Sequence, residues 1–287
     1  MVGAAGRMGT WLVKLLLSEG FHVIASDVDS EGLRKLRIRF PGVVTTMSNR
    51  EAVAGARIVL LAVPIENFEE VVKELKPCIT SEHLVIDVCS VKEEPVRNMH
   101  EYLREGVKLG AHPLFGPGAR TLVGKKVVLT PTTAEETDVA LRIGAWLRSR
   151  GARAILMSSR EHDEYMRVAL GLTHFIGVLL VSELSQYNVG GLKEVSGPLL
   201  DVLLTFASSL LAENLELTVT LQKCLNVRKV AESFMKKGAE PLKKIEEEPQ
   251  AVVRELIEIR DRLSKSGIDP YEEYERLYSF FEGCLSC

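Results

Sequence analysis

Short apolar runs alternate with amphipathic stretches along the first half of the chain. The runs that predict strands after the chain start are Phe21–Ser26, Arg57–Val63, His83–Val88, Val107–Ala111, Lys126–Thr130 and Ala152–Leu156. The stretches between them predict helices at Met8–Ser18, Glu31–Phe40, Asn67–Leu75, Glu94–Arg104 and Ala134–Arg150. Strands that alternate with helices in this way are typical of an α/β domain with a mostly parallel sheet and crossover helices.

This pattern changes near residue 157. From Ser158 onward no strand is predicted, and helices are expected at 160–188, 198–215, 217–237, 241–264 and 270–283. We therefore predict two domains, an α/β domain over 1–157 and an all-helical domain over 158–287. A chain of 287 residues is long enough for two cores. The longest apolar run, Val168–Ser182, contains Thr173 and is too short for about 30 Å of hydrocarbon, so it predicts a buried helix.

A glycine loop lies at the start of the chain. Gly3, Gly6 and Gly9 are spaced GxxGxxG and lead into the first predicted helix. Glycines in such a loop permit a tight turn and let backbone N–H groups approach a pyrophosphate at the positive end of the helix. Only Met1 and Val2 precede the loop, whereas a first strand normally has about five apolar residues. The numbered chain either begins inside that strand or has a truncated start.

An aspartate ends the next predicted strand. Asp27 follows the glycine loop at the interval of about 20 residues expected for a dinucleotide fold, which predicts a Rossmann-type domain. A carboxylate there can accept hydrogen bonds from the ribose hydroxyls of NAD, and it would repel the 2′-phosphate of NADP. Arg7 and Met8 lie within the loop, and Arg7 could instead approach that phosphate. We expect NAD, with NADP the weaker alternative. Val63 and Pro64, after another strand, are expected beside the nicotinamide.

Composition and charge exclude several classes of protein. A formal net charge of −3 gives no general attraction to nucleic acid or to an anionic membrane. Five cysteines without framework spacing fit reduced thiols in a cytoplasmic protein, and no leader segment precedes the first motif. Cys284 and Cys287 form a CxxC pair without a second pair of ligands, so no metal site is expected.

Two polar clusters follow predicted strands at the carboxyl edge of the sheet, where ligands bind in such folds. One contains Ser90 and Lys92, and the other is the sequence HPLFGP that begins at His112. Removal of a hydride from a carbinol requires a base for the hydroxyl proton, and histidine is suited to this near neutral pH. His112 is therefore the candidate base, and Ser90 could orient the hydroxyl. His162 and His174 lie in the first long helix of the second domain and could border the cleft or be structural.

These motifs together resemble the prephenate dehydrogenase family. The sequences SVK, HPLFGP, EHD and GLTHF keep the family's order, and the resemblance runs from the glycine loop to about residue 235. It implies that His112 accepts the proton of the substrate C4 hydroxyl, with Ser90 assisting. It also implies that Lys92, His162 and His174 line the substrate pocket. By the same resemblance we expect a homodimer formed through the C-terminal helices, without nucleic-acid or membrane partners.

The implied reaction is an oxidative decarboxylation of prephenate in tyrosine biosynthesis. Hydride leaves C4 for NAD, and loss of the ring carboxylate as CO2 restores aromaticity, giving 4-hydroxyphenylpyruvate. The family commonly holds a substrate carboxylate with an arginine in the helix after an S-x-P turn. Here the turn is Ser196-Gly197-Pro198, but no Arg or Lys occurs from Pro198 to Gln222, and Asp201 lies in that helix.

This difference leaves three hypotheses. The chain could oxidise prephenate, it could transfer hydride from arogenate or another small hydroxy acid, or it could be a non-catalytic NAD-binding regulatory protein. His112 and Ser90 favour an enzyme, because a protein that only binds NAD needs no base at the sheet edge. If prephenate is the substrate, its ring carboxylate requires a cation from Lys92, Arg167 or a partner subunit.

Overall fold

The computed structural model describes residues 1–212 and 214–282. Within it the chain forms two compact units, Met1–Met166 and a second that begins at Arg167. The boundary expected from the sequence lies earlier, near residue 157. The structure groups α7 (Ser159–Met166) with the first unit, because this helix packs against α5 (Glu93–Tyr102) and β6 (Lys126–Thr130). The Cys284–Cys287 pair lies outside the described residues.

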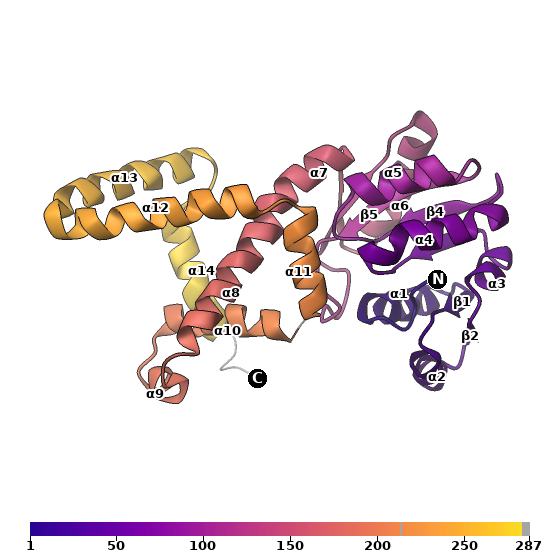
Figure 1. Ribbon diagram of the computed structural model, residues 1–287, viewed down its shortest axis with the longest axis horizontal. Helices are drawn as coiled ribbons and strands as arrows, with labels where there is room; N and C mark the ends of the chain where they lie inside the picture. Colours follow the sequence, from indigo (N-terminus) through magenta and orange to yellow (C-terminus); the bar gives the residue numbers. More distant parts are fainter. Residues whose placement is uncertain (213, 283–287) are drawn as a thin grey trace. The chain divides into compact units, whose positions relative to one another are not determined.

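A mostly parallel sheet forms the centre of the first unit, as predicted (Figure 1). Its main part has the order β3 (Ile58–Leu61), β4 (Leu84–Asp87), β5 (Val107–Pro113), β6 and β7 (Arg153–Leu156), and β1 (Val23–Ser26) pairs separately with β2 (Val43–Thr46). Every one of these pairings is parallel except that of β5 with β6. The short β2 and α3 (Asn49–Ala54) were not predicted, because neither is long enough to show a period.

Helices cover both faces of this sheet. The remaining helices of the first unit are α1 (Arg7–Ser18), α2 (Ser30–Arg39), α4 (Ile65–Leu75) and α6 (Ala134–Arg148), with one 3₁₀ turn at Lys76–Cys78. Consecutive residues of β4 show the two cores, one on each face of the sheet. Val85 packs in a cluster with Phe68 of α4 and Met99 of α5, whereas Ile86 packs with Leu147 of α6 and Trp11 of α1. The sheet is therefore buried on both sides, and its strand ends are left for ligands.

Met1 and Val2 lie between β1 and β3. The amino group of Met1 donates to the carbonyl of Ile24 at 2.8 Å, and Val2 bridges to Ser26 and Leu61 in parallel register. Burial lowers the pKa of this amino group to about 6. Beyond Met1, β1 and β3 have no strand between them, and their residues border a cavity of about 500 Å³. Met1 and Val2 thus lie at one end of the space between β1 and β3.

The second unit is helical throughout its described residues, as predicted. Its elements are a π-helical segment (Arg167–Leu172), α8 (Thr173–Leu184), α9 (Val189–Glu194), α10 (Pro198–Leu211), α11 (Leu215–Cys224), α12 (Arg228–Glu247), α13 (Pro249–Lys265) and α14 (Pro270–Glu282). α8 packs on α10, and α12 packs beside α13 (Figure 1). The single helix predicted over 217–237 is wrong. Asn226 adopts φ of +48° and separates α11 from α12, a conformation that asparagine tolerates better than most residues.

Candidate active site

The glycine loop has the geometry of an anion-binding turn. Gly3 has φ of +76°, and a Cβ there would lie 2.4 Å from the carbonyl oxygen of Ala62. A Cβ on Gly9 would lie 2.1 Å from the carbonyl oxygen of Gly3, so both positions require glycine. Gly6 precedes α1 without a side-chain cap, and the first turn of this helix has no acidic residue. The positive end of α1, with Arg7 exposed and Met8 half-buried, is thus suited to a pyrophosphate.

Asp27 lies against this loop at the end of β1. Its carboxylate accepts hydrogen bonds from the backbone N–H groups of Ala5, at 2.8 Å, and Asp29, at 3.0 Å. These contacts hold the carboxylate beside the glycine loop while leaving it partly exposed. Val63 and Pro64 follow β3, and the Val63 side chain would be 3.1 Å from a Cβ on Gly3. Asp27, predicted beside the adenosine ribose, and Val63 and Pro64, predicted beside the nicotinamide, therefore all lie next to the glycine loop.

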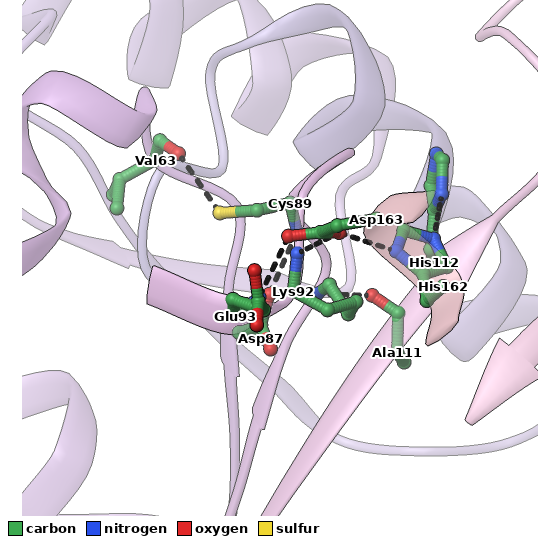
Figure 2. A network of polar contacts seen from close by, with 9 residues as sticks. All are labelled: Val63, Asp87, Cys89, Lys92, Glu93, Ala111, His112, His162 and Asp163. Atoms are coloured by element: carbon green, nitrogen blue, oxygen red, sulfur yellow. Dashed lines mark hydrogen bonds and ion pairs between the residues drawn. The ribbon is translucent and has the colours of Figure 1, made fainter. Parts of the chain in front are cut away.

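A buried ion pair supports the carboxyl end of β4. Lys92 Nζ contacts Asp87 Oδ1 and donates to the carbonyl of Ala111 at 2.8 Å, and the side chains of Lys92 and Asp87 are fully buried (Figure 2). Burial raises the pKa of Asp87, against the opposing effect of the Lys92 ammonium. Lys92 was expected to contact the substrate. In the structure its ammonium instead contacts Asp87 and the carbonyl of Ala111 inside the protein. Lys92 instead ties β4 to β5 next to His112.

His112 lies at the end of β5 and contacts a second histidine. Its Nδ1 lies 2.8 Å from Nε2 of His162 on α7, and His162 Nδ1 lies 2.6 Å from Oδ1 of Asp163 (Figure 2). Asp163 also accepts backbone N–H groups at the start of α5, from Lys92 at 2.8 Å and Glu93 at 2.9 Å. His162 is fully buried, so these protein contacts, rather than the expected exposure to substrate, account for both of its ring nitrogens.

Burial controls the electrostatics of His112. The pKa of His112 is lowered well below 6.5, first by burial and then by the nearby His162 and Lys92. A histidine with a lowered pKa is neutral at neutral pH and can accept a proton at a free ring nitrogen. Ser90 is half-buried in the turn that precedes Lys92. Cys89, between Asp87 and Ser90, is buried, and burial raises the pKa of its thiol, which excludes it as a nucleophile at neutral pH.

The loop after His112 is fixed to the glycine-loop helix. Trp11 Nε1 on α1 donates to the carbonyl of Ala119 at 2.6 Å, and the Trp11 ring packs edge-on against Phe115 at a centroid separation of 5.0 Å. The HPLFGP motif therefore has a structural part besides the histidine. Its aromatic residue holds the loop against the helix whose N-terminus forms the anion-binding turn.

The remaining predicted residues lie in the second unit. His174 is buried on α8, and Arg167 Nε donates to the carbonyl of Leu225 at 2.9 Å. Asp201, in the helix where the resemblance led us to expect an arginine, accepts a hydrogen bond from Ser196 Oγ at 2.5 Å. This contact closes the Ser-Gly-Pro turn and gives the aspartate a local partner.

Two acidic residues of the site were not singled out as site residues from the sequence. Asp163 was noted only as part of EHD, and Asp87, three residues before Ser90, was not named. A signal was present for Asp163, because an acidic residue beside a histidine at a helix start can both cap another helix and orient the ring. Its contact with α5 joins residues 70 positions apart, which no local pattern shows.

Comparison with known proteins gives consistent matches. A family profile described as "Prephenate dehydrogenase, nucleotide-binding domain" matches residues 12–156. The "Probable arogenate/prephenate dehydrogenase" of Methanocaldococcus jannaschii is 30% identical over 82% of this chain and 54% of its own. The "T-protein" of Haemophilus influenzae is 27% identical over 76% of this chain and 53% of its own. The chain spans about half the length of the curated relatives it matches.

Solved structures show the same fold. A prephenate dehydrogenase from Aquifex aeolicus has a TM-score of 0.69 at 25% identity and covers 93% of this chain and 98% of its own. An A. aeolicus structure with hydroxyphenyl propionate and NAD+ has a TM-score of 0.72 at 23% identity, over 92% of this chain and 96% of its own. The Synechocystis arogenate dehydrogenase has a TM-score of 0.70 at 17% identity, over 93% and 98%. These matches cover the helical unit as well as the α/β unit.

Proposed function

Because this chain belongs to the prephenate dehydrogenase family, we propose that it catalyses the NAD-dependent oxidative decarboxylation of prephenate to 4-hydroxyphenylpyruvate. One observation supports this most directly. His112 is buried at the carboxyl edge of the sheet, with a lowered pKa and one ring nitrogen engaged by His162. That arrangement suits a base for a substrate hydroxyl in a nucleotide-binding fold.

The residues of the first unit divide the chemistry among them. NAD, when bound, supplies the hydride acceptor. The uncapped N-terminus of α1 and the glycine loop would hold its pyrophosphate, and Asp27 would accept hydrogen bonds from its adenosine ribose. His112 removes the proton from the substrate C4 hydroxyl as the hydride leaves C4. Ser90 orients that hydroxyl. Loss of CO2 then restores aromaticity and needs little further help from the protein.

The direct experiment is to measure NADH production with prephenate and with arogenate. Production of NADH with prephenate, together with 4-hydroxyphenylpyruvate in stoichiometric amount, is the expected result. Production of NADH with arogenate but not with prephenate would show that arogenate, the amino analogue, is the substrate. Absence of NADH with both substrates, in a protein that binds NAD, would contradict the proposed function.

Arogenate is the second candidate, on a specific observation. No Arg or Lys occurs from Pro198 to Gln222, where the resemblance led us to expect a cation for a substrate carboxylate. Arogenate carries an ammonium group where prephenate has a ketone, so a site with fewer cations suits it better. The name of the M. jannaschii relative includes both substrates.

We propose further that the protein acts in the cytoplasm as a homodimer formed through its C-terminal helices. Large apolar side chains lie exposed on several helices of the second unit, with exposed fractions of 69% for Leu199, 70% for Val219 and 58% for Leu256. The helical segment Ser159–Leu184 is long and apolar enough to cross a membrane by length and composition. Only 22% of its most apolar stretch is buried within one chain, so most of that surface is exposed in a monomer. A second copy would cover such surfaces.

Light scattering on the purified protein tests the dimer. A mass twice that of one chain, without detergent, is expected, and charged substitutions at Leu199 and Val219 should shift the mass toward the monomer. A monomer at micromolar concentration, or a protein that remains in solution only with detergent or lipid, would contradict the proposal.

A further inference from the structure

A continuous line of polar contacts joins the start of α5 to His112 (Figure 2). Asp163 accepts the backbone N–H of Lys92 on Oδ1 and that of Glu93 on Oδ2. The same Oδ1 lies 2.6 Å from His162 Nδ1, and His162 Nε2 lies 2.8 Å from His112 Nδ1. Each hydrogen bond in this line has a donor and an acceptor. The bond between Asp163 and His162 decides which atoms donate in the bond between the two histidines.

The directions follow from what each group can donate. A carboxylate has acceptors only, so the proton between Asp163 and His162 belongs to His162 Nδ1. A neutral imidazole has one N–H, and therefore His162 Nε2 is an acceptor. The proton between the two histidines then belongs to His112 Nδ1. His112 Nε2 is left with its lone pair, which is the atom that a general base requires.

We propose that Asp163 and His162 are positioning residues that fix His112 in the tautomer with an unprotonated Nε2. This inference rests on the proposed function for its catalytic meaning, although the tautomer itself does not depend on it. Neither residue touches the reacting atoms. Asp163 has a second task, because the same carboxylate anchors α7 to the N-terminus of α5 and so fixes the distance between the two histidines.

The line also provides a place for the proton. When the substrate O–H bond breaks, its proton bonds to His112 Nε2 as the hydride leaves the substrate carbon. The Nδ1 proton of His112 can then pass to His162 Nε2, which leaves a neutral His112 and an imidazolium at His162. The positive charge then lies 2.6 Å from the Asp163 carboxylate rather than beside the Lys92 ammonium. One proton and one hydride have left the substrate, and the histidine pair holds the proton.

The charged groups around His112 make this pair sensitive to pH. His162 and Lys92 face His112 directly, and Asp163 and Asp87 lie behind them as their partners. A proton added to His162 would reverse the bond to His112 and place a proton on His112 Nε2. Protonation of either ring therefore removes the free Nε2 lone pair that a general base requires.

Nitrogen NMR of the imidazole rings tests the tautomer without substrate. In the wild-type protein near pH 7.5, we expect the His112 spectrum to show a protonated Nδ1 and an unprotonated Nε2, with assignments from H112N and H162Q. A protonated Nε2 as the main form of His112 would overturn the proposal. This measurement is independent of turnover, so it stands even where the wild-type protein oxidises neither prephenate nor arogenate.

Two variants separate positioning from packing. Asp163→Asn keeps one oxygen for the N–H of Glu93 but places an amide N–H where Oδ1 accepts from Lys92 and His162, which favours the opposite tautomer of His162. We expect turnover to fall about 100-fold or more, the scale of a lost general base, with NAD affinity unchanged. His162→Gln retains a carbonyl oxygen that can accept a hydrogen bond from His112 Nδ1. Its turnover should therefore fall less than that of Asp163→Asn. His100→Gln, a histidine of α5 that contacts Thr132 and Glu136, is the matched control and should keep wild-type turnover.

The pH profile of kcat/KM distinguishes these variants further. His162 is one of the groups that lower the pKa of His112, so its removal should shift the acid limb toward higher pH. A purely structural role would lower the melting temperature and leave the acid limb in place. Turnover of D163N within threefold of wild type, or an acid limb unchanged in H162Q, would contradict the relay. Failure of both wild-type substrates would instead contradict the proposed function.

Discussion

His112 can accept a proton only while its Nε2 is free, and its surroundings favour that state. Burial, His162 and Lys92 all lower its pKa, so the imidazole remains neutral below the ordinary histidine value of 6.5. A base works in its unprotonated form, and activity is therefore lost as the pH falls through the lowered pKa. We expect the acid limb of kcat/KM to lie below pH 6.5 in the wild-type enzyme. An acid limb at or above this value would show that His112 is not the group that titrates.

Replacement of the base gives the corresponding kinetic prediction. His112→Asn should cut turnover by about 100-fold or more, the usual contribution of a general base. The affinity for NAD should hardly change, because the glycine loop and Asp27 lie on other elements. Turnover is measured from NADH absorbance at saturating substrate, and NAD affinity by calorimetry. Near-wild-type turnover in this variant would remove His112 from the catalytic role.

We expect Asp27 to decide between the two nicotinamide cofactors. Its carboxylate is held beside the glycine loop by the N–H groups of Ala5 and Asp29, where it would repel a 2′-phosphate. We expect the wild-type protein to prefer NAD, and Asp27→Ser to narrow the preference. The measurement is the ratio of kcat/KM for NAD and NADP, with Arg7→Gln as the companion variant. A wild-type preference for NADP would indicate that Arg7 controls this pocket.

Lys92 contributes stability in place of the expected substrate contact. Lys92→Met would leave the Asp87 carboxyl buried without its cation, and breaking such a pair typically costs about 3–5 kcal/mol. The pKa of Asp87 is already raised by burial, so its carboxyl is protonated more readily in the folded state. The destabilisation should therefore grow as the pH rises above the ordinary aspartate range and shrink as it falls. Urea unfolding at pH 5 and pH 8 measures this, with Lys108→Met as the half-buried control. Equal losses for the two variants would contradict the prediction.

At the scale of elements, Met1 and Val2 hold the position between β1 and β3 in the sheet. A cavity of about 500 Å³ continues beyond them. Ile58, at the border of this cavity, is 47% exposed. An unpaired gap between two strands leaves backbone N–H and C=O groups without partners and apolar side chains in contact with water.

An extension added before Met1 tests whether the space between β1 and β3 can take up further strand residues. Addition of four apolar, β-branched-rich residues before Met1 should fill the space and raise the melting temperature by several degrees, since each buried aliphatic side chain contributes about 1.5–3 kcal/mol. A serine–glycine extension of equal length is the control, and equal melting temperatures would contradict the reading.

For the whole molecule, a substrate carboxylate at the site requires a cation. The Lys92 ammonium is paired with Asp87, and Arg167 donates through Nε to the carbonyl of Leu225. A partner subunit is the third candidate from the sequence. Arg120 is an exposed cation in the loop that follows His112. If prephenate is held by such a cation, its KM should rise with ionic strength, because salt screens exposed charges within about 10 Å at 0.1 M. A KM indifferent to salt would favour a site without a cation.

The sequence by itself determined the α/β architecture, the helical second unit and the residues gathered at the sheet edge. Periodicity, the glycine spacing and polar residues at strand ends are local signals. Each of them is carried by residues that lie close together in the sequence. It did not reveal β2, α3 or the break at Asn226, which are too short or too dependent on one φ angle. Only the tertiary structure decided what the polar residues do. Lys92 became a buried partner of Asp87, and His162 became a link between His112 and Asp163. The contact of His112 with His162 joins residues 50 positions apart, and Lys92 and Asp87, only five apart, pair inside the protein because folding buries both side chains. Burial then sets which atoms can reach a substrate.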